Sequence, residues 1–428
     1  LYNVGSHDDP IDQKGMTGLQ RFIMQESGSY NEMSYLERNA RLEVISNESK
    51  YKHTFDLMYF SYEVNPKDLE EIIAIESNRL SSIDITDESL ERAKKMMLSE
   101  GKKIYSEQRR THSTYPLGHP YKFDNWGDTL HIKSILIEDA ITYRKKYINP
   151  NSTTIVVVGN FNSKEVVQFI YREFANIKNN GRVQLDPDFS ISESTIPHKK
   201  FNGDSGISRN LIENGFFVHV ISTSINIPSF REDDMFTIKH IANLVRYDSA
   251  LEQQYAKKYL NKNGTISLAF TDEKLGPSKF DIITINFLKK KSFKKVKRNI
   301  SKMLRDISNK GFDEDFLTIY KNRELLKLYT KRCFRCESLS LGENEIIYGD
   351  YRKLNREIQR LEDLNNDEIR RVATKYLAGQ NINSFEALEG RRNLLTPLFN
   401  FFWNGILMNI PAMRLNMKKP NLENNDDW

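Results

Sequence analysis

Apolar residues form two kinds of pattern along the chain: helical spacing, and short runs rich in β-branched residues. In residues 62–78, Leu69, Ile72, Ile73 and Ile75 stand at helical spacing, and Thr86 opens a second apolar-periodic segment with a Thr-x-Glu sequence. Helices are therefore predicted over residues 62–78, 86–110, 135–146, 163–177, 292–309 and 313–339. Runs rich in β-branched residues predict strands over 153–159, 216–225 and 279–287. Long helices beside antiparallel or mixed strands indicate the α+β fold class.

A faint internal duplication divides the chain. Residues 135–148 resemble 363–377, and residues 85–90 resemble 312–317, at similar offsets. We predict two homologous halves, each a sheet of mostly antiparallel strands with helices packed on one face, and a tail: residues 1–185, 186–390 and 391–428. By the same offset, the strand near Val218 would have its counterpart before Leu1. The first half is therefore expected to lack its opening strand here.

Composition narrows the class of protein. The chain has 428 residues, of which 39% are apolar and 28% charged, as expected for a folded chain of more than one domain. A net charge of +5 is too small for a dedicated nucleic-acid-binding protein. Two cysteines exclude a disulfide scaffold and a multi-cysteine metal cluster. The first ten residues show no signal-like segment, and no run of 18 apolar residues occurs.

Several segments, taken in order, resemble landmarks of the pitrilysin and mitochondrial-processing-peptidase family, particularly its bacterial members. They are residues 4–10 (Val-Gly-Ser-His-Asp-Asp-Pro), Gly18-Leu19, 75–80, 115–121 (Tyr-Pro-Leu-Gly-His-Pro-Tyr), 147–151 with 158–161, and 341–377. The resemblance extends from residue 1 to about residue 390. It implies a half-clam of two α+β halves, which closes with a second half-clam around a peptide chamber. In this family one half-clam holds zinc through an inverted motif.

The zinc motif is where this chain departs from the family. Relatives follow Gly-Leu with His-x-x-Glu-His on a helix, whose imidazoles hold zinc while the glutamate activates water. Here the three positions are Arg21, Met24 and Gln25. A guanidinium has no free lone pair at neutral pH, a thioether cannot act as a base, and a carboxamide is a poor zinc donor. We therefore expect no catalytic residue at these degenerate positions.

A single carboxylate remains from the family's metal site. Glu100 stands at about the spacing of the family's third ligand, whereas the acidic residue that many relatives carry seven positions earlier is Ala93. One carboxylate does not make a zinc site, so no metal and no cofactor are predicted. Glu100 is interpreted as a relic that is hydrogen-bonded to Arg21.

No other segment replaces the lost motif. None of the eight histidines is followed by glutamate three positions later or by Glu-x-x-His. Zinc-free subunits of the family often keep an Arg-x6-Tyr pair in the second half that grips the substrate. The arginine near that stretch is Arg246, and Gln253 lies seven residues after it. The absence of this pair also weakens the prediction that the chain holds substrate for a zinc-bearing partner.

Three further features have a functional and a structural interpretation, and the structural one is preferred. Cys333 and Cys336 form a Cys-x-x-Cys inside a predicted helix, so we interpret them as ordinary helix cysteines rather than as a redox or metal pair. His119 is interpreted as a turn residue rather than a base. The basic run over 289–298 is interpreted as a solvated helix start rather than a site for phosphate or acidic lipid.

The tail is strongly apolar and aromatic over residues 394–413. Proline, glycine and asparagine interrupt it, so it cannot cross a bilayer as a clean helix. Three alternatives stay open: packing on its own body, docking on another protein, and lying at a membrane interface. The predicted partner- or membrane-docking residues are Phe399, Phe401, Phe402, Trp403 and Leu407.

Together these features predict a catalytically inactive homologue of a zinc metallopeptidase, acting as a structural or regulatory subunit of a larger assembly. The alternative is the chamber-forming half of a heterodimeric peptidase whose partner carries the zinc. A weaker third hypothesis is an envelope or organelle-membrane scaffold that docks through its tail. The bacterial resemblance favours the periplasm or cell envelope, with a mitochondrial location as the alternative.

Overall fold

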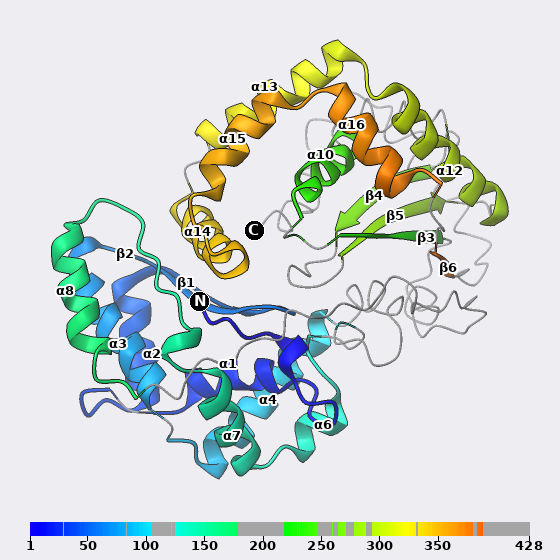
Figure 1. Cartoon of the computed structure of the whole chain (residues 1–428). Helices are drawn as coiled ribbons and strands as arrows, with labels where there is room; N and C mark the ends of the chain where they lie inside the picture. The colour runs from blue at the N-terminus through cyan, green and yellow to red at the C-terminus, as the bar shows by residue number, and fades with distance from the viewer. Residues whose placement is uncertain are drawn as a thin grey trace, which may run out of the picture.

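The computed structural model shows two units (Figure 1). The structure describes residues 1–28, 30–82, 84–104, 121, 125–178, 218–228, 230, 232–246, 259, 264–270, 278–287, 293–330, 333–379 and 383–387. Among these, one unit carries a two-stranded sheet and the other a four-stranded sheet. The described part of the chain is therefore helix-rich with small antiparallel sheets, in agreement with the predicted α+β class.

The first unit is built around the β1–β2 hairpin. Its elements are η1 (Ser6–Asp8), α1 (Met16–Glu26), α2 (Tyr35–Ile45), β1 (Ser46–His53), β2 (Met58–Val64), η2 (Pro66–Asp68), α3 (Leu69–Ser81), α4 (Asp87–Ile104), α6 (Thr129–Ser134), α7 (Ile137–Tyr147), η4 (Pro150–Ser152) and α8 (Ser163–Phe174). Strands β1 and β2 pair antiparallel, with Tyr51 opposite Phe60. Ser34 caps α2 by accepting a hydrogen bond from the Glu37 amide, while Glu37 accepts one from the Ser34 amide, so a capping box fixes where this helix begins.

The second unit holds a sheet of order β4-β5-β3-β6, in which all pairs are antiparallel. Its elements are β3 (Val218–Ile227), α10 (Asp234–Arg246), β4 (Gly264–Phe270), β5 (Ser278–Phe287), α12 (Phe293–Lys310), α13 (Glu314–Thr330), α14 (Phe334–Tyr348), α15 (Lys353–Asp363), α16 (Asn366–Val372), η7 (Ala373–Leu377) and β6 (Asn383–Ala387). Helix α12 buries one apolar stripe at helical spacing, formed by Val296, Ile300, Met303, Leu304 and Ile307. That stripe belongs to the core of this unit.

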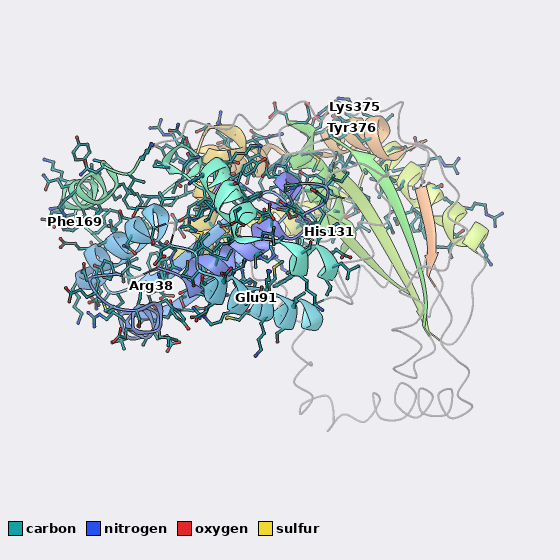
Figure 2. The ribbon with its side chains drawn as sticks, turned by 90° about the horizontal axis from the view of Figure 1, so that it is seen from below. Arg38, Glu91, His131, Phe169, Lys375 and Tyr376 are labelled. Atoms are coloured by element: carbon teal, nitrogen blue, oxygen red, sulfur yellow. A yellow bond between two sulfur atoms is a disulfide. The ribbon has the colours of Figure 1, made fainter. Side chains whose placement is uncertain are left out.

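Asp234 joins the start of α10 to the end of the α16–η7 segment. Its carboxylate accepts hydrogen bonds from Arg371 at 2.6 Å, and from Lys375 Nζ and the Tyr376 hydroxyl at 3.0 Å each. These donors, the Arg371 guanidinium foremost, lower the pKa of Asp234. Figure 2 shows Lys375 and Tyr376 on the unit that carries the four-stranded sheet, and Arg38 on the other unit.

Helix α14 connects the two units, because it lies beside β2 (Figure 1). The Arg335 guanidinium on α14 forms ion pairs with Glu48 of β1 at 2.5 Å and with Glu63 of β2 at 3.8 Å. Gly342 permits close packing here, since a Cβ atom at this position would lie 2.6 Å from a methyl group of Leu1. The junction is therefore held by apolar packing together with a partly buried cluster of charges.

Most of the predicted elements are confirmed, within a few residues at their ends. Strands β3 and β5 match the predictions over 216–225 and 279–287, and helices α7, α8 and α12 match those over 135–146, 163–177 and 292–309. Helix α4 confirms the described part of the helix predicted from Thr86. The duplication remains a prediction, and the boundary at 185/186 and the tail over 391–428 lie outside the described residues.

Three predictions about elements were wrong. Residues 62–64 belong to β2 rather than to a helix, and α3 begins only at Leu69, after a turn at Asn65 and Pro66. Residues 153–159 are not a buried strand: Thr153 makes one bridge to Tyr2, and Ile155 is 41% exposed. Branched side chains favour strands only where a neighbouring strand is present to pair, and none of the described strands pairs with residues 155–159.

The third wrong prediction was one continuous helix over 313–339. The structure has two helices, because Cys333 is extended, with φ of −94° and ψ of 103°, and caps α14. None of the described helices combines the length and apolarity needed to cross a membrane.

His240 makes the stability of the second unit sensitive to acid. Its ring is buried, and Nδ1 lies 2.5 Å from the Tyr320 hydroxyl. Burial, followed by the charges of Lys239 and Arg360, lowers the pKa of His240 to about 3. Between the ordinary pKa of about 6.5 and this lowered value, the unfolded chain takes up a proton that the folded chain does not. The stabilising contribution is therefore complete above pH 6.5 and is lost as the pH falls toward 3.

We predict that acid lowers the free energy of unfolding less steeply in His240→Gln than in the unmodified chain. The expected difference is at most about 1.4 kcal/mol per pH unit below about pH 6. Urea unfolding followed by tryptophan fluorescence and circular dichroism at pH 7.5, 6.5, 5.5 and 4.5 measures it. Parallel pH profiles for the two proteins would contradict the assignment.

Candidate functional site: a degenerate metal-binding helix

Helix α1, which carries the three motif positions, is held in place by the buried carboxylate of Asp9. This carboxylate accepts hydrogen bonds from the Gly15 amide at 2.8 Å, and from the Thr17 amide at 2.8 Å and hydroxyl at 2.7 Å. Gly15, with φ of 103°, supplies the left-handed turn at which the helix starts. Burial raises the pKa of Asp9 to about 6, although the hydrogen bonds from Thr17 and Gly15 oppose that rise.

The three motif side chains occupy different surroundings. Met24 is 1% exposed and belongs to the apolar core of the first unit. Gln25 is half-buried, and its side-chain Oε1 has no hydrogen-bond partner among the described residues, whereas its backbone carbonyl accepts from Arg38 at 2.7 Å and from Asn39 at 3.1 Å. Met24 is thus a core residue, and of the three motif side chains only Arg21 is charged.

Arg21 lies against Glu100, as the sequence analysis expected. Its guanidinium donates from Nη2 to Glu100 Oε2 at 2.9 Å and from Nη1 to the Tyr51 carbonyl at 2.7 Å. It also lies 3.9 Å from the centre of the Phe22 ring. Burial lowers the pKa of Arg21, and Glu100 opposes this shift, so the side chain stays charged at neutral pH. The relic carboxylate is therefore already paired with a cation that belongs to the chain.

His53, at the end of β1, is a neighbour of this site that the sequence analysis did not single out. Its ring is buried 4.7 Å from the Trp126 ring, and within the part of the chain that the structure describes its Nε2 has no hydrogen-bond partner. A Cβ atom at Gly18 would lie 2.8 Å from that nitrogen, so only glycine fits there. Burial first, and then the charge of Arg21, lower the pKa of His53 well below its ordinary value. No motif spacing links His53 to α1, because the contact is made across β1.

These residues do not fit a zinc ion. A zinc site needs three or four lone-pair donors from His, Cys, Asp or Glu at close range. Here one carboxylate is engaged by a guanidinium, and one neutral imidazole lies within reach of that same positive charge. Within the described ranges, no three such side chains come together in a way that could hold a metal. The Arg21 guanidinium would repel a cation in this space, and the described residues around it do not supply a full set of donors.

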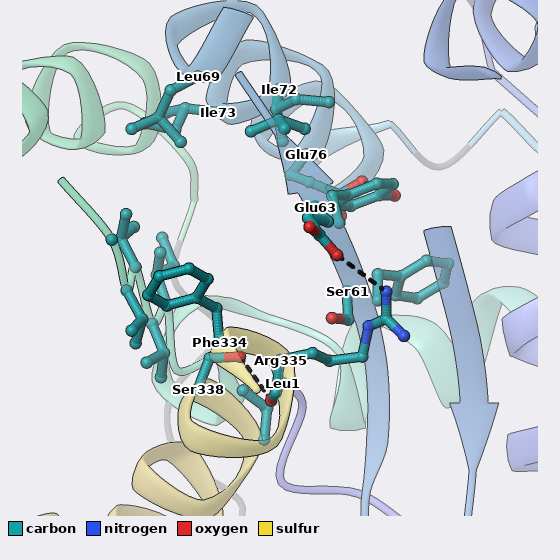
Figure 3. Close-up of a pocket in the computed structure, with 18 of the residues that line it drawn as sticks. Leu1, Ser61, Glu63, Leu69, Ile72, Ile73, Glu76, Phe334, Arg335 and Ser338 are labelled. Atoms are coloured by element: carbon teal, nitrogen blue, oxygen red, sulfur yellow. Dashed lines mark hydrogen bonds and ion pairs between the residues drawn. The ribbon is translucent and has the colours of Figure 1, made fainter. Parts of the chain in front are cut away.

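A separate cavity of about 420 Å³ lies where α14 meets β2, α3 and the segment 153–161 (Figure 3). Its wall is mainly apolar, with Phe60, Ile72 and Phe334 among the lining residues, and Glu63 and Arg335 add charge. Neither Arg21 nor Glu100 lines it. The sequence analysis did not identify this cavity, because its wall comes from segments that are far apart in the chain.

Several predicted positions lie outside the described residues. They are His119, Gln253, the start of the basic run (289–292) and the docking residues Phe399, Phe401, Phe402, Trp403 and Leu407. Arg246 is the last residue of α10. These interpretations therefore remain predictions.

Known proteins resemble this chain both in sequence and in fold. Residues 134–324 match the family model described as the peptidase M16 inactive domain. A curated bacterial protein, "zinc protease PqqE" of Helicobacter pylori, is 18% identical over 262 residues. Over residues 134–324 the chain is similar to the peptidase M16 family. The match to the curated relative spans 57% of this chain and 54%, or about half, of that relative's length. The resemblance stated from the sequence landmarks is therefore confirmed.

Solved structures with the same fold come from bacteria and from a fungus. A protease from Helicobacter pylori has a TM-score of 0.74 at 15% identity, covering 90% of this chain and 92% of its own. The first half of the periplasmic protease PqqL from Escherichia coli has a TM-score of 0.64 at 13% identity, covering 93% and 87%. A chain of Complex III2 from Candida albicans has a TM-score of 0.66 at 12% identity, covering 94% and 92%. At these identities the likeness shows an M16 fold and nothing further.

Proposed function

We propose that this chain is a catalytically inactive M16 homologue that acts as a structural or regulatory subunit of a larger protein assembly. The observation that supports inactivity best is the pairing of Arg21 with Glu100 at 2.9 Å. A zinc peptidase uses a ligated metal to activate water and a carboxylate to accept its proton. Here Glu100, at the position of the third metal ligand, is paired with the buried guanidinium of Arg21. The position of the general base is occupied by the core residue Met24.

The proposal of an assembly has support of a different kind. The matched family model is that of an inactive domain, and one fold neighbour is a chain of a multi-subunit complex. The apolar tail provides a candidate docking segment through Phe399, Phe401, Phe402, Trp403 and Leu407. A net charge of +5 in 428 residues gives no reason to propose nucleic acid as the partner.

The alternative is a non-catalytic, chamber-forming half whose partner carries the zinc. It is favoured by the likeness to the first half of the periplasmic protease PqqL. This chain covers 87% of the solved first half and 45% of the solved PqqL chain. In this reading the described units form a half-clam that closes on a zinc-bearing homologue. The missing Arg-x6-Tyr pair counts against it, because such a half would be expected to help hold the substrate.

For the location we propose the periplasm or cell envelope, with mitochondria as the alternative. The first is supported by the likeness in fold to the periplasmic protease PqqL. The second is supported by the likeness to a chain of Complex III2.

Co-purification of the tagged full chain from its native cell tests the proposal. Crosslinking, mild extraction and mass spectrometry are expected to recover a stable protein partner. A partner without His-x-x-Glu-His supports the subunit role, and one with that motif, active only together with this chain, supports the alternative. Recovery of a lone chain at native abundance would contradict both.

A matched pair of truncations tests the docking segment. Ending the chain at residue 390 is expected to abolish recovery of the partner. Ending it at residue 414, which keeps the predicted docking residues, is expected to retain the partner. Equal recovery with both truncated chains would show that the tail is not the docking segment.

A further inference from the structure

The only two cysteines of the chain meet at the first turn of α14. Cys333 is the N-cap residue, and Cys336 is the third residue of the helix. They are joined by a disulfide, with their Cα atoms 5.1 Å apart. The sequence analysis interpreted them as ordinary cysteines inside one long helix. The break between α13 and α14 places them at a helix N-terminus instead, where a Cys-x-x-Cys has different chemistry.

This position stabilises a thiolate on Cys333 when the disulfide is open. The Cys336 amide donates a hydrogen bond to the Cys333 sulfur at 3.1 Å. The unpaired amides at the start of a helix also carry partial positive charge, which favours an anion there. Sulfur in this setting ionises more readily than an ordinary cysteine. The charge of Arg335 adds little to this effect, since Glu48 and Glu63 already engage it.

The pair is accessible to a small reagent, and its disulfide constrains the chain only weakly. Cys336 is exposed, Cys333 is half-buried, and Phe334 between them is 53% exposed. The disulfide closes a loop of sequence separation three. So short a loop removes little entropy from the unfolded chain, so the bond contributes little as a structural crosslink. The same short loop makes ring closure fast once one sulfur has been activated.

We propose that Cys333 and Cys336 form a redox-active pair that exchanges with low-molecular-weight disulfides. In the oxidising direction, the Cys333 thiolate attacks one sulfur of a small disulfide, forms a mixed disulfide and releases one thiolate. The Cys336 thiolate then attacks the Cys333 sulfur, closes the internal disulfide and releases the second thiolate. Two electrons pass from the pair to the small disulfide, and the two protons of the cysteine thiols end on the released thiols.

The exchange takes place at the junction of the two units. Arg335 lies between the two cysteines in sequence and pairs with β1 and β2, and Phe334 and Arg335 line the cavity. The site is distinct from the degenerate motif on α1, because Arg21 and Glu100 do not line this cavity. The inference is independent of whether the chain is an inactive subunit.

Equilibration of the full chain with mixtures of reduced and oxidised glutathione, without oxygen, tests the proposal. Alkylation followed by intact-mass analysis is expected to show one two-electron transition within the glutathione range. Each molecule is expected to carry either two alkylated cysteines or one internal disulfide. A pair that stays fully reduced or fully oxidised across the range would overturn the proposal. Accumulation of glutathione adducts without ring closure would overturn it too.

Single variants test the role of each sulfur. Cys336→Ser keeps the amide that donates to Cys333, and Cys333→Ser leaves Cys336 alone. At pH 6.5 we expect Cys333 in the first variant to react with a maleimide about tenfold faster than Cys336 in the second, because the amides at the helix start favour the Cys333 thiolate. Circular dichroism confirms that both variants fold. Equal rates with ordinary pKa values would contradict a stabilised thiolate at the helix start.

Discussion

Asp9→Ala is expected to lower the free energy of unfolding by about 3 kcal/mol or more, because buried donors lose their acceptor. The carboxylate accepts from the Gly15 amide and from both the amide and the hydroxyl of Thr17, and the Tyr143 hydroxyl lies 3.3 Å away. An alanine leaves the Gly15 and Thr17 amides buried without this acceptor, whereas the Thr17 hydroxyl still reaches the Gly5 carbonyl at 2.8 Å and the Tyr143 hydroxyl at 2.6 Å. Since the two amides mark the start of α1, its first turn is expected to loosen, and the position of Arg21 with it.

Asp12→Ala is the matched control for this prediction. Asp12 is an exposed residue of the same type in the same loop, so its removal is expected to change the free energy of unfolding by less than about 0.5 kcal/mol. Asp9→Asn serves as a second probe, because an amide presents a donor where the carboxylate accepts. Urea unfolding at pH 7.5 compares the four proteins. If Asp9→Ala costs no more than Asp12→Ala, the carboxylate does not hold α1 in place.

Glu100→Gln is expected to lower the free energy of unfolding by about 1–3 kcal/mol, because it leaves the buried Arg21 charge without its anion. The lower part of that range is expected, since the Glu100 side chain is 48% exposed and water screens the pair. Arg21→Met is expected to cost a similar amount, through the Tyr51 carbonyl and the lost contact with Phe22. The double variant is expected to cost about 1 kcal/mol less than the sum of the two single changes.

The control for this cycle lies on the same helix. Glu88 lies 4.0 Å from Arg92, and the two side chains are 89% and 37% exposed. Glu88→Gln is therefore expected to change the free energy of unfolding by less than about 0.5 kcal/mol. Strict additivity of the Arg21 and Glu100 changes would show that the two side chains do not form a stabilising pair.

Local periodicity predicted the elements that bury one continuous face. Helix α12 is such a case, because Val296, Ile300, Met303 and Ile307 repeat at helical spacing on one side. Residues 153–159 failed for the opposite reason: their composition favours a strand, but pairing depends on a neighbour that local composition does not reveal. The break at Cys333 was missed because apolar residues continue through it.

The candidate site was predictable only in part. The spacing of Glu100 from α1 indicated that it would meet Arg21, and the structure confirms the contact. The Tyr51 carbonyl and the His53 ring were not predictable, because strand β1 brings them to α1 from a segment with no motif of its own. The disulfide at the start of α14 depended on where a helix begins, and helix boundaries are the least reliable part of a sequence-based prediction.

Metal analysis combined with a peptide-cleavage assay on the purified full chain tests the central claim most directly. After incubation with excess zinc and gel filtration, the chain is expected to carry far less than one zinc per molecule and to show no chelator-sensitive hydrolysis of a mixed peptide library. An M16 peptidase with an intact His-x-x-Glu-His serves as the positive control. One zinc per chain, with chelator-sensitive hydrolysis that Glu100→Gln abolishes, would contradict the account.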